Sequence, residues 1–211
     1  MMSRSAFWAA SLRSSTRRRT ITPLTLNSLT AACNQSSNRN PVVSFDEPTV
    51  AEGVEALRQR QLVWLVSQAG GRAVKYEQRL TEAFTLSLQE TALLCVLMLR
   101  GPQTFGELRG RAERIYPFAD LAETEAVMQV LMSAEPEPLA MKLPRLPGTK
   151  ESRFAHLLAG PIEVEAVVAA MEEERGRGAS SALVHLETEV QGLRAELAEL
   201  REAFEAFKAQ F

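Results

Sequence analysis

The residues best suited to binding chemistry lie in an amide-rich turn that ends at Pro41. Asn34, Asn38 and Arg39 place two carboxamides and a guanidinium close together in this turn. Such groups either cap neighbouring helices or contact the bases and backbone of nucleic acid, and both interpretations stay open. The predicted nucleic-acid-binding set adds four cations from later in the chain: Arg72, Lys75, Lys150 and Arg153.

Catalytic and metal chemistry find little support in the sequence. His156 and His185 are the only histidines, and neither has a carboxylate or cysteine at local ligand spacing. Cys33 and Cys95 occur singly in apolar helical contexts, which is typical of small buried residues rather than of a zinc or disulfide framework. Glycine-rich phosphate loops are absent from the sequence. We therefore expect a non-enzymatic protein with no catalytic residues, no metal and no cofactor.

Four motifs follow one another in a distinctive order. They are Asn-Ser-Leu-Thr-Ala-Ala-Cys-Asn-Gln-Ser-Ser-Asn-Arg-Asn-Pro-Val at 27–42, Gly-Gly-Arg-Ala-Val-Lys-Tyr-Glu-Gln-Arg-Leu at 70–80, Arg-Gly-Pro-Gln-Thr-Phe-Gly-Glu-Leu-Arg at 100–109 and Pro-Gly-Thr-Lys-Glu-Ser-Arg-Phe-Ala-His-Leu at 147–157. Together they resemble the YceH-like family of uncharacterised bacterial proteins. The resemblance implies a tandem winged-helix fold with no settled activity. Two departures are Ser36, where the family usually has Lys, and an unrecognisable first helix.

The elements expected from periodicity agree with a mainly α fold that carries small β-hairpins, an α+β class. Residues 21–80 are predicted to form a first winged-helix domain that lacks its first helix. Its expected elements are helices over 26–33 and about 48–59, then strands over 62–66 and 73–78 with a glycine-bearing turn at 68–72.

Residues 81–160 repeat this order as a second winged-helix domain and add an initial helix. The expected elements are helices over 87–100, 104–115 and 120–134 and a hairpin over 139–157. Thr104 and Glu107 have the spacing of a capping box. The two copies align within the chain with an offset of 73 residues over the helices and 78 over the hairpins.

The C-terminal part is predicted to be a helix and flexible hinge over 161–181 and a coiled coil over 182–211. Apolar residues alternate at spacings of three and four, at Leu183, Leu186, Val190, Leu193, Leu197, Leu200, Phe204 and Phe207. Glu189 and Arg194 stand where charges pair between parallel helices. This pattern predicts a parallel homodimer, with a solvated amphipathic helix as the alternative.

Residues 1–20 form a leader of doubtful status that is rich in Ser and Arg and contains no acidic residue. This composition is shared with organelle transit peptides, although a substitute first helix or an incorrect start explains it as well. The longest apolar run, near residues 92–99, is far shorter than a membrane span. We expect a cytoplasmic protein with no membrane association.

Two functions from different classes remain. Winged helices favour a DNA-associated regulator that acts as a dimer on double-stranded DNA, an inference from fold alone. The starts of the expected third helices, residues 46–52 and 120–125, are acidic and lack any base. Acidic groups repel phosphate, so the hairpins and the amide-rich turn would have to make the DNA contacts. The alternative is a scaffold that uses the helix faces and the coiled coil to bind another protein.

Overall fold

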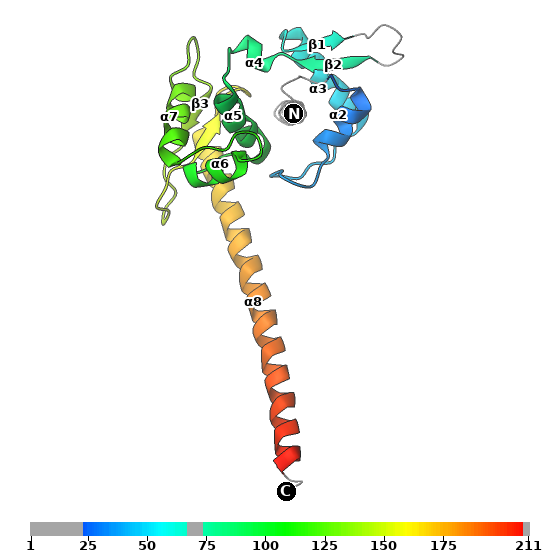
Figure 1. Cartoon of the computed structure of the whole chain (residues 1–211), viewed down its shortest axis with the longest axis vertical. Helices are drawn as coiled ribbons and strands as arrows, with labels where there is room; N and C mark the ends of the chain where they lie inside the picture. Colours follow the sequence, from blue (N-terminus) through cyan, green and yellow to red (C-terminus); the bar gives the residue numbers. More distant parts are fainter. Residues whose placement is uncertain (1–22, 67–73, 209–211) are drawn as a thin grey trace. The chain divides into compact units, whose positions relative to one another are not determined.

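The computed structural model describes residues 23–66 and 74–208. Contacts divide the chain into one unit over residues 1–162 and a second over 163–211, and each is described by itself. The first unit combines helices with small antiparallel hairpins, and the second is a single long helix (Figure 1). The α+β class expected from the sequence is therefore confirmed. The leader, the turn at 68–72 and Arg72 lie outside the described residues.

The first repeat begins with two helices, α2 (Leu26–Cys33) and α3 (Glu47–Gln59). A hairpin of β1 (Val63–Val66) and β2 (Lys75–Gln78) follows them. Thr25 caps α2 by accepting a hydrogen bond from the Ser28 amide, and Asp46 caps α3 by accepting one from Thr49. The strands pair with Val63 opposite Gln78. Leu24 extends this hairpin by an antiparallel bridge to Tyr76.

A short helix, α4 (Leu80–Ala83), leads into the second repeat. Its elements are α5 (Leu88–Arg100), α6 (Phe105–Ala112), α7 (Leu121–Met132), β3 (Ala140–Lys142) and β4 (Phe154–His156). The capping box predicted at Thr104 and Glu107 is confirmed, because the Thr104 side chain accepts from the Glu107 amide and the Glu107 carboxylate accepts from the Thr104 amide. Gln103 bridges to Phe154 just as Leu24 bridges to Tyr76.

The register between the two repeats differs from the expected one over the helices. The offset of 73 aligned Val54 with Val127, but Val127 is only half-buried. The caps Asp46 and Asp120 lie 74 residues apart, and this spacing aligns the buried Val54 with the buried Met128. The 73-residue offset was based on matching residue types. Equivalent positions in the two helices are instead those that lie at the same distance from the N-cap and are buried on the same face. The offset of 78 over the hairpins holds, since Tyr76 and Phe154 both receive the bridging strand.

The core of the first unit is centred on α5, which is apolar on every side. Ala92, Leu93, Leu94, Cys95 and Leu97 have no exposed surface. A helix that is hydrophobic all round must be surrounded by other elements. Contacts with α6, α7 and β4 supply this cover within the second repeat. Burial of each leucine contributes roughly 2 kcal/mol to stability.

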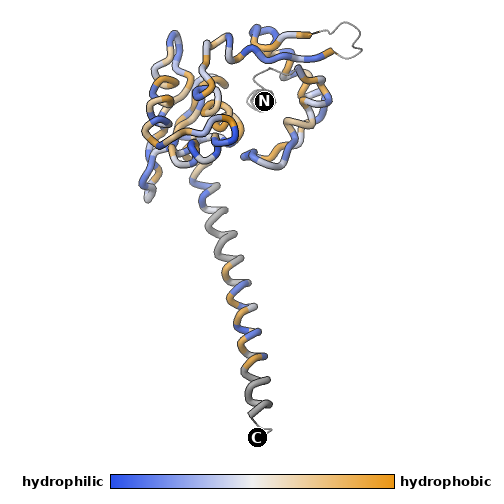
Figure 2. The backbone as a smooth tube through the Cα atoms, in the orientation of Figure 1, coloured by the Kyte–Doolittle hydropathy of each residue, from blue (hydrophilic) through white to orange (hydrophobic). Residues whose placement is uncertain are grey.

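The second unit is one continuous helix, α8 (Val164–Lys208), so the flexible hinge predicted around residues 175–181 is wrong (Figure 1). Gly176 and Gly178 each cost about 1 kcal/mol relative to alanine in a helix. Long runs of helix-forming residues on both sides propagate the helix through this cost, because extension needs no new nucleus. Hydrophobic and hydrophilic residues alternate along the described middle of α8 (Figure 2). Each helix of the described residues is either too short or too polar to span a lipid bilayer.

Candidate functional site

Asn34, at the start of the amide-rich turn, braces the first repeat internally. Its Nδ2 donates a hydrogen bond to the Phe45 carbonyl oxygen at 2.7 Å, and its Oδ1 accepts one from the Phe45 amide, also at 2.7 Å. Phe45 directly precedes Asp46, the cap of α3. Both ends of the side-chain amide are therefore engaged in holding the end of α2 against the start of α3.

The rest of the turn connects the first repeat to α5. Asn38 has a left-handed backbone with φ of 58°, and its Oδ1 accepts a hydrogen bond from Arg100 Nη2 at 2.7 Å. The Asn40 amide donates to the Leu99 carbonyl oxygen at 3.0 Å. These two links cross from the first repeat to the end of α5, so the turn acts as a bracket between the repeats.

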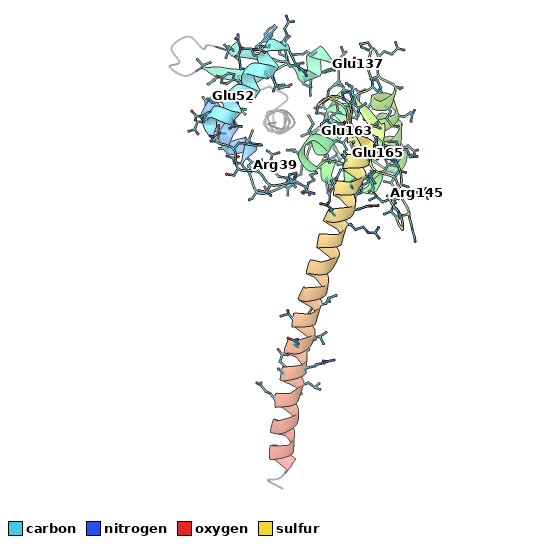
Figure 3. All side chains as sticks on the ribbon, turned by 180° about the vertical axis from the view of Figure 1, so that it is seen from behind. Arg39, Glu52, Glu137, Arg145, Glu163 and Glu165 are labelled. Atoms are coloured by element: carbon cyan, nitrogen blue, oxygen red, sulfur yellow. The ribbon has the colours of Figure 1, made fainter. Side chains whose placement is uncertain are left out.

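Arg39 lies in the same turn, where Figure 3 labels it. Only 7% of its surface is exposed, and its Nη2 donates to the Ala32 carbonyl oxygen at the end of α2. Burial raises the pKa of the neighbouring Cys33 thiol, and the positive charge of Arg39 partly opposes that rise. A buried guanidinium is poorly placed to reach an external phosphate, so this residue is engaged in the fold.

A groove of about 830 Å³ opens beside this turn. Its described lining comes from the turn, from α5, and from α6 with the residues that follow it: Asn38, Cys95, Val96, Leu99, Arg100, Gly110, Arg111, Glu113, Arg114 and Ile115. The described lining contains three arginines and one glutamate, which gives it an excess of positive charge. Arg111 also forms an ion pair with Glu107, in which Arg111 Nη2 lies 3.5 Å from Glu107 Oε1.

The candidate cations of the hairpins lie in different settings. Arg153 Nη1 donates to Glu107 Oε2 and to the Pro102 carbonyl oxygen, both at 2.8 Å, which fixes β4 to the start of α6. Lys75 is half-buried in β2, whereas Lys150 is exposed in the loop between β3 and β4. The structure therefore brings Asn34, Asn38 and Arg39 together and leaves the described hairpin cations apart from them.

The predicted nucleic-acid-binding set does not include Arg100, Arg111 or Arg114, although the basic residues of the helix expected over 104–115 are able to engage phosphate. Arg111 lies in the last turn of α6, and Arg114 lies in the turn that follows this helix, three residues further along the chain. That spacing was a usable signal. The sequence gives no signal that Arg100 lies near these two arginines, because that proximity depends on the packing of α5 against α6.

His156 in β4 gives the second repeat a pH-dependent stability. Burial lowers the pKa of His156 from 6.5 to about 4, so the folded protein holds this imidazole neutral. The unfolded chain binds a proton below about pH 6.5 while the folded chain does not. The stabilisation is therefore fully present above that pH and is lost as pH falls from about 6.5 towards 4.

We expect a His156→Gln variant to have a flatter pH dependence than the wild type. The wild-type free energy of unfolding should fall by roughly 2 kcal/mol more than that of the variant between pH 7 and pH 5. Urea denaturation at the two pH values, followed by circular dichroism, measures the difference. Identical losses in the two proteins would show that His156 does not titrate abnormally.

Comparison with known proteins places the chain among bacterial sequences of the same kind. A family model described as "Protein of unknown function, DUF480" matches residues 15–149. A UPF0502 protein of Pelobacter propionicus is 48% identical over 193 residues, which cover 90% of this chain and 87% of the relative. A UPF0502 protein of Azoarcus sp. is 47% identical over 190 residues (90% and 84%), and one of Photobacterium profundum is 42% identical over 192 residues (87% and 86%). The chain therefore belongs to the uncharacterised bacterial family DUF480, together with these UPF0502 proteins.

Proposed function

We propose that this protein is a non-enzymatic, cytoplasmic DNA-associated regulator, built from tandem winged-helix domains and dimerised through α8. The observation that carries the proposal is the repeated series of bridging strand, helix, helix and hairpin. Each repeat places its bridge, Leu24 with Tyr76 or Gln103 with Phe154, on the strand that closes the hairpin. This order supports a winged helix, a fold whose frequent role is to bind duplex DNA.

The charges favour contact through hairpins rather than through helix starts. The cap of α3, Asp46, accepts hydrogen bonds from Thr49 that lower its pKa and keep it ionised. At α7, the Glu123 carboxylate accepts from Tyr116 Oη at 2.8 Å and from the Ala119 amide at 2.7 Å. These carboxylates occupy the helix N-termini where a phosphate would otherwise bind.

Exposed cations instead lie around the second hairpin. Lys142, Arg145 and Lys150 are all exposed, and Figure 3 marks Arg145. Lys75 supplies a cation to the first hairpin. Such scattered charges release counterions from duplex DNA without reading its sequence, so we expect weak, salt-sensitive association.

The apolar stripe of α8 supports the dimer. Leu186, Val190, Leu193, Leu197 and Leu200 are between 44% and 69% exposed in the single chain. A stripe with this heptad spacing is buried when two helices coil together. Glu189 and Arg194 would then pair between parallel chains, whereas antiparallel chains would bring like charges together. The side chains of Leu183, Phe204 and Phe207 lie outside the described part of the structure.

Replacing Lys75 and Lys150 with glutamine should weaken duplex binding and flatten its salt dependence. If each lysine neutralises one phosphate, the slope of log K against log salt should decrease by about two. Fluorescence anisotropy with a labelled duplex over a salt series measures this slope.

The matched control is Arg58→Gln with Arg60→Gln, which also removes two positive charges but at the C-terminal end of α3. Its slope should equal that of the wild type. Equal losses in both double variants would indicate a bulk-charge effect rather than hairpin contacts.

A scaffold function is the alternative, and a specific observation favours it. Leu121 and Val130 on α7 are 51% and 52% exposed. The same helix begins with acidic residues, so its surface suits a protein partner better than phosphate. Failure of the wild-type protein to associate with duplex DNA even at low salt would make this the leading function.

A further inference from the structure

The groove beside the amide-rich turn has the size of a small-molecule site. Its volume is about 830 Å³, whereas sites for small organic ligands commonly occupy about 300–1,000 Å³. An isolated inorganic anion would fill only a small part of this space. The dimensions therefore suit an organic molecule that carries a charged group.

The charge of the lining identifies that group. Arg100, Arg111 and Arg114 face the groove together with Glu113, which leaves an excess of two positive charges. A phosphate monoester carries about −1.5 to −2 charges at neutral pH, as phosphorylated side chains do. Guanidinium forks match phosphate oxygens bidentately, which makes arginine the preferred residue for this recognition. A lone carboxylate would leave part of the positive charge unbalanced.

One of these arginines is already oriented in the structure. Asn38 Oδ1 accepts from Arg100 Nη2, and the left-handed backbone of Asn38 aims its side chain at α5. A side chain held in place loses less conformational entropy when a ligand binds. Arg111 is held more loosely, at 3.5 Å from Glu107, so a phosphate can compete for it.

Part of the lining is apolar. Val96 and Leu99 are 4% and 5% exposed, and Ile115 is half-buried beside them. Ile115 offers apolar surface to the organic body of a ligand, whereas Val96 and Leu99 are almost completely covered. The phosphates on the outside of a duplex carry no such body, so DNA does not match both halves of the groove.

We propose that the groove binds a small organic phosphate monoester, of the nucleoside monophosphate class. The ligand would contact Asn38 from the first repeat and Arg111 and Arg114 from the second. Its binding would therefore strengthen the bracket between the repeats. This site is independent of the DNA-associated function, because it uses neither Lys75 nor Lys150.

Isothermal titration of the full-length protein with adenosine 5′-monophosphate tests the proposal. We expect a dissociation constant below about 1 mM at low salt. Adenosine alone and inorganic phosphate alone should each bind at least about tenfold more weakly, since each meets only half of the lining. Arg111→Ala with Arg114→Ala should weaken binding of the monophosphate by at least about tenfold.

Arg58→Ala with Arg60→Ala is the matched control, because it removes two exposed cations outside both the groove and the hairpins. Thermal melting checks that both double variants fold, and the single variant Arg114→Ala replaces the double one if the latter is unfolded. Absence of binding by the wild type, or equal weakening in the groove and control variants, would overturn the proposal. Displacement of the monophosphate by duplex DNA, with tighter binding of the duplex to the same arginines, would also overturn it and assign the groove to nucleic acid.

Discussion

Replacing Leu193 and Leu197 with aspartate is expected to convert the full-length protein from a dimer to a monomer. Both leucines lie in the apolar stripe of α8, where they are 59% and 49% exposed in the single chain. A paired helix would bury two carboxylates per chain in an apolar seam with no partner, which costs several kcal/mol for each buried charge. Light scattering at about 50 µM, a concentration at which a dimer of micromolar affinity is fully assembled, measures the change.

The matched control is Gln191→Asp with Ala195→Asp. These positions belong to the same turns of α8 but lie outside the stripe, so the variant gains the same charge and should stay dimeric. A wild-type protein that is monomeric at this concentration would contradict the dimer. The exposed leucines would then belong to a solvated helix or to a surface for another protein.

Substitution of Asn34 by alanine should lower the free energy of unfolding of the first unit by roughly 2 kcal/mol, because two backbone groups of Phe45 lose their partners. Chemical denaturation followed by circular dichroism measures this loss. Gln35→Ala is the control, since Gln35 is the exposed neighbour and its change should stay within about 0.5 kcal/mol.

The same variant separates the two interpretations of the amide-rich turn. With Asn34 acting as a brace, any duplex binding should persist under conditions in which the variant is folded. Unchanged stability together with lost binding of duplex DNA would instead assign this residue to nucleic-acid contact.

Local features of the first unit were predictable because they depend on neighbouring residues. The cap at Thr104 with Glu107, and Pro48 in the first turn of α3, are interactions over a few positions, so their patterns survive in the sequence. The buried faces of α2 and α5 follow from apolar spacing in the same way. The hinge predicted from the local composition around Gly176 is absent, because the cooperativity of a long helix outweighs the local preference of one glycine.

What only the tertiary structure decided was the role of the polar side chains. The sequence by itself determined that Asn34, Asn38 and Arg39 are dense in hydrogen-bonding groups, but it left their partners open. In the folded protein, Asn34 forms hydrogen bonds with the backbone of Phe45. Asn38 forms one with the side chain of Arg100, which lies 62 positions away in the sequence. A polar group has several partners of equal chemistry, and only packing selects among them, whereas an apolar residue needs only to be buried.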